Sequence, residues 1–225
     1  NPLYLDFENS EPPPVGFADL MEKYRGRSDR QWVMAQLGER YFIDPDGGSD
    51  AGDGTSDASA WKTLGRLDDV RLGPGDEVRL KSGTRAAGRL VPAGCGSADA
   101  PIRIRPYGEG ARPRIDGEGR TLETVLLRNV EHVELRDLDI TNEGAQREKG
   151  RAGVRVEAVD CGTVHGIRLI GLHIHDVNGV NIPMRGGEGI VWENRGPRVP
   201  TRFDGLTIEG CHITRTDCSG IRGYS

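Results

Sequence analysis

The sequence has no run of about 20 apolar residues, the length that a membrane-spanning helix needs. It also lacks a strong excess of charge, since the formal net charge of −5 gives no general attraction to nucleic acid or to an anionic membrane. Glycine and proline are abundant, at 33 and 13 of 225 residues, which disfavours long helices and coiled coils. We therefore expect short strands joined by turns, with no membrane span and no nucleic-acid partner.

Cysteine and short catalytic motifs are scarce as well. The four cysteines, Cys95, Cys161, Cys211 and Cys218, lack the paired spacing of a zinc motif. They permit disulfides in an exported protein but do not define a pairing. No nucleophile elbow, P-loop or dinucleotide fingerprint occurs, so phosphate cofactors and serine-hydrolase chemistry have no support. The chain starts at Asn1 without a signal-peptide pattern, as a processed N-terminus also would.

Three regions differ in their patterns. Residues 1–40 contain apolar side chains at helical spacing from Phe17 to Tyr24 and from Trp32 to Leu37, which predicts an N-terminal arm with two capping helices. Residues 41–120 are rich in turns and are expected to form an entrance segment and the first coils of a repeat. Residues 121–225 carry the regular repeat itself.

The repeat is visible when residues 132–140, 166–174 and 205–213 are laid over one another. Each segment has an alternating apolar pair, a two-residue corner and a second apolar pair. The alternation slips by one residue at the corner. Because side chains alternate between the two faces of a strand, one straight strand cannot keep all four apolar groups on one face, whereas two strands that meet at a bend can.

A third strand follows in each unit, at residues 125–127, 153–156, 189–192 and 220–222. Three short strands per repeat predict an all-β fold, namely a right-handed single-stranded parallel β-helix with an N-terminal helical and loop cap. A flat β-sandwich is the structural alternative, because regular short strands are also typical of sandwiches. Residues 220–225 begin a coil without completing it, so we expect a missing segment or a partner to cover the C-terminal coil.

The entrance segment contains the motifs of a known group. Residues 41–50 (YFIDPDGGSD), Gly54-Thr55, residues 61–64 (WKTL) and residues 73–76 (GPGD) together resemble the opening of exported bacterial β-helix proteins. Those bacterial proteins are the carbohydrate-active members of the pectate-lyase-like superfamily. The resemblance implies a secreted or periplasmic protein whose partner is a polysaccharide or oligosaccharide. It also implies a substrate groove floored by the strand that begins with the Gly-Ile type pair.

Alignment of that strand predicts two outward columns of side chains. One contains Arg155, Val191 and Arg222, and the next contains Glu157, Glu193 and Tyr224. A lyase needs a cation, a base and an acid, roles that Arg222 and Tyr224 could fill. Equally, Glu157 and Glu193 could hold one Ca²⁺ or act as the two carboxylates of a retaining glycosidase. The alternative is a solvated cross-strand ladder of Glu and Arg without chemistry.

A second cluster lies on the strand after the corner. Asp139, His173 and His212 are expected to share one outward column, and Thr141, His175 and Thr214 the next, with Asp176 and Arg215 beside them. Histidine next to a carboxylate suits general-base catalysis or metal ligation. We therefore count His173, His175 and His212 as catalytic candidates and Arg215 as a substrate-binding candidate. The alternative is that exposed histidines on this flank are inert.

The glycine-rich loop at residues 177–188 supplies further candidates, because loops on a rigid scaffold commonly carry ligand contacts. Asn178, Asn181, Arg185 and Glu188 are predicted to bind substrate together with Arg155; a flexible bridge is the alternative. The sequence thus predicts a carbohydrate-active enzyme, a polysaccharide lyase or a glycoside hydrolase. The sequence indicates no definite cofactor. Ca²⁺ is the cofactor that the carboxylates would suit. A non-catalytic glycan-binding or surface-adhesion β-helix is the alternative function.

Overall fold

The chain divides into two compact units, residues 1–37 and 38–225. A computed structural model describes residues 38–180 and 186–224, and the account below concerns these alone. The two helices predicted between Phe17 and Leu37 lie outside the described residues. The division of the chain near residues 40 and 120 stays a prediction.

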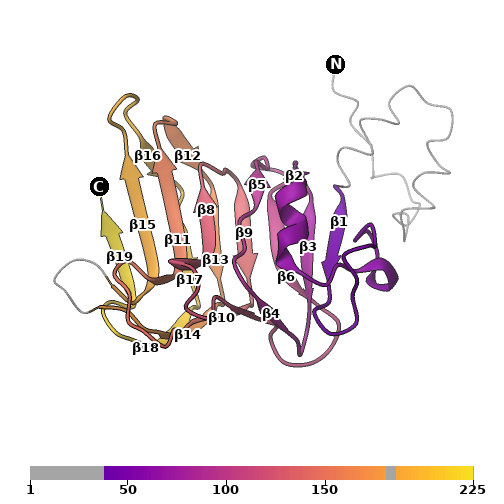
Figure 1. The fold of residues 1–225 in the computed structure, drawn as a ribbon. Helices are drawn as coiled ribbons and strands as arrows, with labels where there is room; N and C mark the ends of the chain where they lie inside the picture. Colours follow the sequence, from indigo (N-terminus) through magenta and orange to yellow (C-terminus); the bar gives the residue numbers. More distant parts are fainter. Residues whose placement is uncertain (1–37, 181–185, 225) are drawn as a thin grey trace, which may run out of the picture. The chain divides into compact units, whose positions relative to one another are not determined.

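Nearly all of the described secondary structure is parallel β-strand, and three sheets contain most of it (Figure 1). Sheet 1 contains β1 (Arg40–Ile43), β3 (Glu77–Lys81), β6 (Ile102–Tyr107), β9 (Val133–Arg136), β13 (Ile167–Ile170) and β17 (Thr207–Glu209). Sheet 2 contains β4 (Arg85–Ala87), β7 (Arg114–Asp116), β10 (Asp139–Asn142), β14 (His173–Val177) and β18 (His212–Thr216). Sheet 3 contains β8 (Glu123–Arg128), β11 (Ala152–Val159), β15 (Glu188–Arg195) and β19 (Ile221–Tyr224).

The remaining elements are short. Two small parallel pairs join β2 (Arg71–Leu72) to β5 (Ala93–Gly94) and β12 (Thr163–His165) to β16 (Arg202–Asp204). The 3-10 helices are η1 (Asp57–Ser59) and η2 (Leu64–Asp69). None of the helices in the described part of the chain has the length and hydropathy needed to cross a bilayer.

From β6 onward the chain visits sheets 1, 2 and 3 in a constant order, and each strand pairs in parallel with its equivalent one coil away. Figure 1 shows the result as β8, β11 and β15 lying side by side. The predicted alignment is the observed register: Leu135 pairs with Leu169, and Leu169 pairs in turn with Ile208. The all-β, parallel architecture is therefore confirmed, and its coil order is consistent with a parallel β-helix.

The core lies between the three sheets because each strand turns its apolar side chains inward. In β3, for example, Val78 and Leu80 are fully buried and alternate with partly exposed neighbours. Val133, Leu135, Leu138 and Ile140 of one repeat are fully buried on both sides of the corner. The one-residue slip in the sequence thus corresponds to a bend between sheets 1 and 2.

The corner itself needs a left-handed backbone residue. Asp137, Gly171 and Gly210 occupy equivalent positions in three coils, with φ of 55°, 61° and 61°. Aspartate tolerates this conformation better than most side chains, and glycine adopts it without strain. A Cβ at Gly171 would also come 2.4 Å from Asp137 Oδ1, so a larger residue there would require the Asp137 side chain to move. These positions fix the bend in every repeat.

The aspartates of residues 44–57 organise turns, as their composition indicated. Asp50 Oδ1 accepts hydrogen bonds from the backbone N–H groups of Lys62 and Thr63, both at 2.9 Å. Asp53 Oδ1 accepts from the hydroxyls of Thr55 at 2.9 Å and Ser59 at 2.6 Å. These carboxylates therefore satisfy the backbone and side-chain donors of the entrance loop.

The inward column of sheet 3 is less buried at its last strand. Ile221 pairs with the fully buried Ile190 but is itself 50% exposed, and Trp192 is only partly buried. Ile221 belongs to β19, which pairs only with β15 among the described strands, so no further strand covers its other side. Cys211 packs against the core. All four cysteines are free thiols.

A buried arginine ties neighbouring coils together beneath sheet 3. Arg151 is 2% exposed and donates to the backbone oxygens of Gly119 at 2.9 Å, Gln146 at 2.9 Å and Asn178 at 3.2 Å. It also donates to the side-chain oxygen of Asn178. Carbonyl groups from separate coils thus share one cation as their hydrogen-bond donor.

Replacement of Leu172 by alanine is expected to lower the free energy of unfolding by about 2–5 kcal/mol, because this fully buried side chain would leave a cavity. Chemical denaturation followed by circular dichroism measures the change. The matched control is Val199→Ala, at a side chain that is 43% exposed, where about 0.5 kcal/mol or less is expected. Equal effects at both positions would contradict the assignment of Leu172 to the core.

Candidate functional site

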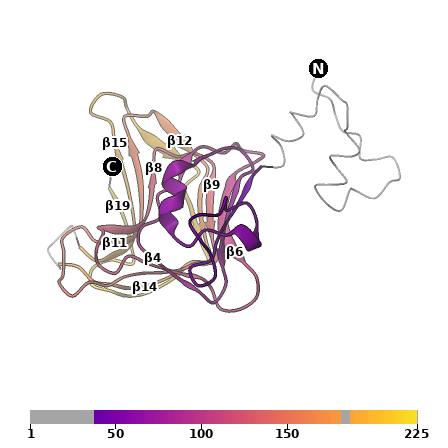
Figure 2. The same cartoon turned by 45° about the vertical axis from the view of Figure 1, so that its right-hand side comes forward.

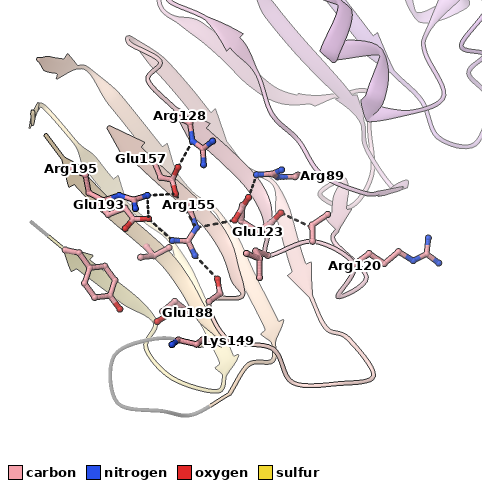
Figure 3. Close-up of a pocket in the computed structure, with 15 residues that line it drawn as sticks. Arg89, Arg120, Glu123, Arg128, Lys149, Arg155, Glu157, Glu188, Glu193 and Arg195 are labelled. Atoms are coloured by element: carbon pink, nitrogen blue, oxygen red, sulfur yellow. Dashed lines mark hydrogen bonds and ion pairs between the residues drawn. The ribbon is translucent and has the colours of Figure 1, made fainter. Parts of the chain in front are cut away.

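A pocket of about 690 Å³ lies on the outward face of sheet 3, and charged side chains line most of it (Figure 3). The strands place these side chains in register. Glu157 on β11 pairs with Glu193 on β15, and Glu193 pairs in turn with Tyr224 on β19. Arg155 pairs with Val191 in the neighbouring column. The two predicted columns are therefore present as aligned, and the pocket lies over them.

Arg155 lies at the centre of the pocket (Figure 3). Its side chain is 14% exposed and forms ion pairs with Glu123 at 3.2 Å and with Glu193 at 3.1 Å. Its Nη2 also donates to the carbonyl of Gly150 at 2.7 Å. One buried cation thus links carboxylates from two strands that are not neighbours, β8 and β15.

Glu157 is the most strongly held of the pocket's carboxylates. It is 4% exposed and accepts a hydrogen bond from Arg128 Nε at 2.5 Å. Burial alone would raise its pKa, but the hydrogen bond from Arg128 and the nearby charges of Arg128 and Arg155 hold that pKa below its ordinary value. Glu157 is therefore an ionised carboxylate at neutral pH, paired with Arg128.

The lowered pKa of Glu157 predicts a specific pH dependence. A folded-state pKa below the unfolded value contributes stability that is present above about pH 4.3 and is lost as the pH falls through the folded value. The difference in unfolding free energy between the wild type and Glu157→Gln should therefore shrink from about pH 7 to about pH 3. Denaturant titrations at a series of pH values measure it. A difference that does not change with pH would show that Glu157 does not titrate as described.

Several residues of the pocket escaped the sequence interpretation. Arg128 pairs with Glu157, and Glu123 aligns with Glu188 through Ala152, so both lie in columns that contain a predicted residue. Arg195 pairs with Val159 at the end of β15, in a column that contains none. Extending the aligned strand of residues 125–127 by one position would have revealed Arg128. Arg89 and Lys149 come from connecting segments, where no repeat pattern predicts a position.

The other predicted residues of sheet 3 lie at or near the pocket. Glu188, 2% exposed, lines it, as does Tyr224. Arg222 donates to the Tyr224 hydroxyl at 3.3 Å and to Ser219 Oγ at 2.8 Å. The hydrogen bond to Tyr224 is the main cause that raises the pKa of Arg222, which therefore carries a fixed positive charge. Tyr224 and Arg222 thus act as a pair at the end of the described columns.

Of the predicted loop residues that the structure describes, Glu188 lines the pocket and Asn178 does not. Asn181 and Arg185 lie outside the described residues. Asn178 is used in the fold, since its Nδ2 donates to the carbonyl of Gly144 at 2.6 Å and its Oδ1 accepts from the Gly144 N–H at 3.0 Å. It therefore closes a loop between coils, and it is not among the residues that line the pocket.

The histidine cluster is a separate site. His173 and His175 lie on β14 and His212 on β18, so all three belong to sheet 2 and not to the pocket on sheet 3. The expected columns are confirmed, because Asp139 pairs with His173, and His173 pairs in turn with His212. Arg215 also belongs here, where it forms an ion pair with Asp176 at 2.5 Å. The sequence pattern had already assigned the two groups to different strands.

The Ca²⁺ expected at Glu157 and Glu193 does not fit the residues around them. Arg128, Arg155 and Arg195 all lie within 4.0 Å of one or both carboxylates. These guanidinium groups already neutralise the negative charge that a calcium site needs. We derive no step through calcium.

The known proteins that this chain resembles are carbohydrate-active enzymes. No family model matches the sequence. The chain is 27% identical to a lacto-N-biosidase of Bifidobacterium longum subsp. longum over 84% of its own length and 16% of that protein. The crystal structure of GH136 lacto-N-biosidase from Eubacterium ramulus, as a selenomethionine derivative, matches with a TM-score of 0.71 and 27% identity. That match covers 89% of this chain and 36% of the other.

The native form of the same Eubacterium ramulus enzyme gives a TM-score of 0.72 and 25% identity over 92% of this chain and 39% of that one. This chain therefore spans well under half the length of each of these relatives. The chain is therefore similar in both sequence and fold to lacto-N-biosidases, which are carbohydrate-cleaving glycoside hydrolases.

Proposed function

We propose that this chain forms part of a glycoside hydrolase that cleaves an oligosaccharide against the outward face of sheet 3. The observation that carries the proposal is the pair formed by Glu157 and Glu193, which lie in register on adjacent strands inside the pocket. Glycosidases of both stereochemical classes use two carboxyl groups that flank the scissile bond. Similarity to lacto-N-biosidases makes hydrolysis the preferred reaction, and lacto-N-biose the preferred sugar unit of the substrate.

The two carboxyl groups have different surroundings. Glu157 is 4% exposed and is held ionised by Arg128, which suits the nucleophile. Glu193, whose side chain is 14% exposed, is then the acid that protonates the leaving oxygen and afterwards, as a base, activates water. Adjacent strands are about 4.8 Å apart, near the carboxyl separation of about 5–5.5 Å in retaining enzymes. We expect the product to retain its anomeric configuration.

Neighbouring side chains suit recognition of sugar hydroxyl groups. Glu123, Glu188 and Arg155 are fixed within the pocket and offer acceptors and donors, and Tyr224 adds an aromatic ring. Arg222 and Tyr224 would serve a lyase if the substrate were a uronide, which is the other reaction that the sequence allowed. A right-handed solenoid of the pectate-lyase-like type and export from the cell belong to this proposal, on the strength of the entrance motifs.

Non-catalytic glycan binding is the second candidate function. One observation favours it: Glu157 is already engaged by Arg128 at 2.5 Å and lies 3.8 Å from Arg195. A carboxylate tied in this way is also what a structural cross-strand ladder contains. A ladder holds a groove rigid without performing chemistry.

The test is to incubate the purified chain with lacto-N-biose-containing oligosaccharides and with uronic-acid polysaccharides, following reducing ends and ultraviolet absorbance. Reducing ends without new absorbance are expected from a hydrolase. Absorbance that rises with reducing ends would replace the proposal with a lyase. Glycan binding by calorimetry without turnover would support the binding module, and neither binding nor turnover in a folded sample would reject the pocket as a glycan site.

A further inference from the structure

A second cluster of reactive side chains lies on sheet 2, around the corner from the pocket. Asp139 on β10 and His173 and His175 on the neighbouring strand β14 each offer one ligand atom, and these atoms lie within 4.8 Å of one another. In the view of Figure 2, β14 lies below β11 and β8. None of the three residues takes part in the proposed glycan chemistry.

The distances within the cluster suit a metal ion. His175 Nε2 lies 2.9 Å from one oxygen of Asp139, and His173 Nδ1 lies 3.5 Å from the other. Ligand atoms of a tetrahedral Zn²⁺ are about 3.3 Å apart, given bonds of about 2.0–2.1 Å. The two observed separations bracket that value. An ion placed between His175 Nε2 and Asp139 requires only a small adjustment of these side chains.

The second ring nitrogen of His175 has a carboxylate beside it, as metal-binding histidines usually do. Its Nδ1 lies 2.6 Å from Asp176 Oδ2, and Arg215 holds that carboxylate with contacts of 2.5 and 2.7 Å. The same guanidinium places its Nη2 2.8 Å from His175 Nδ1. A carboxylate on Nδ1 leaves Nε2 as the ligand atom, which is the nitrogen that faces Asp139.

Buried hydroxyls adjoin His175 on both sides. Thr141 and Thr214 occupy its register positions on β10 and β18. The side-chain oxygen of each is buried and has no hydrogen-bond partner among the described residues. A buried hydroxyl without a partner costs free energy, so such a pair indicates a polar ligand, such as a metal-bound water, beside them.

We propose that Asp139, His173 and His175 bind one divalent transition-metal ion of the zinc type and thereby clamp two successive coils together. Two imidazole nitrogens and a carboxylate oxygen favour Zn²⁺ over Ca²⁺ or Mg²⁺, which prefer oxygen ligands alone. Metal binding releases into solvent any proton that a ligand atom carries. Arg114, 3.3 Å from Asp139, and Arg215 offset the two carboxylate charges, so moderate affinity is expected.

The experiment is calorimetric titration of the metal-stripped full chain with Zn²⁺, with metal content measured after gel filtration. We expect one Zn²⁺ per chain and a higher thermal midpoint when it is bound. His173→Gln should weaken binding by about tenfold or more, and Asp176→Asn, which changes only the support of His175, by about 10- to 100-fold. The matched control is His165→Gln, at a histidine that lies 3.3 Å from Asp204 but outside the cluster.

The variants also guard against misfolding. His173 and Asp176 are 31% and 30% exposed, so their replacement should leave the circular dichroism spectrum unchanged, unlike replacement of the buried His175. Co²⁺ provides a second readout, because its visible bands should appear in the wild type and His165→Gln but not in His173→Gln. Absence of stoichiometric Zn²⁺, or equal affinity in all four proteins, would overturn the proposal.

Discussion

Replacing Glu193 with glutamine is expected to reduce oligosaccharide turnover by a factor of about 10² to 10⁴ and to leave the fold intact. Glutamine keeps the size of the side chain and its position in the column, but it cannot donate and take back the proton of the leaving group. The rate constant of hydrolysis under saturating substrate measures the loss, and circular dichroism verifies the fold. This prediction rests on the proposed hydrolase function.

The matched control is Glu209→Gln, at an exposed glutamate on β17 that does not line the pocket. Its turnover should equal that of the wild type. Turnover of Glu193→Gln within a factor of about 3 of the wild type would assign Glu193 to a structural ladder. In that case the catalytic carboxylates lie elsewhere, and the pocket is left with a binding role.

Replacing Arg155 with methionine should lower the free energy of unfolding by about 3–5 kcal/mol. The guanidinium neutralises Glu123 at 3.2 Å and Glu193 at 3.1 Å, and Glu123 is 6% exposed. Without it, a buried carboxylate loses a charged partner, while methionine preserves the packing of the stem. Chemical denaturation measures the change, and glycan affinity should fall with it.

Two comparisons separate charge from packing at Arg155. Arg120→Met removes a guanidinium from the same pocket, but its side chain is 80% exposed, so about 0.5 kcal/mol or less is expected. The double variant Arg155→Met with Glu123→Gln should recover part of the lost stability, since it also removes a buried carboxylate. A double variant less stable than the single one would locate the effect in packing.

The sequence predicted the columns of this protein well because inward and outward positions alternate along each strand. Once the two-residue corner at Arg136 and Asp137 was recognised, the alignment gave the register of sheets 1 and 2. The aligned third strand gave that of sheet 3, including the Glu157–Glu193 pair. The exposure of Ile221 was not predicted, because burial depends on whether a further strand covers the inner face, and a repeat pattern does not record this.

The alignment also could not predict which side chains the connecting segments contribute to the pocket. Arg89 reaches Glu123 from a segment between sheets 2 and 3, and no periodicity links the two residues. The division of the candidates into two clusters, in contrast, followed from the repeat pattern. His175 and Glu193 both point outward from their strands, and the bend between sheets 2 and 3 directs them to different faces.

The constant order in which the chain visits the three sheets makes the coil a unit of length for any ligand that lies along sheet 3. Each added coil extends the outward columns by one position, about 4.8 Å, without disturbing the coils already present. Gain or loss of whole coils therefore changes how many sugar residues a groove accommodates, while Arg155 and its carboxylates keep their geometry. Substrate length and local chemistry can thus be altered independently during evolution.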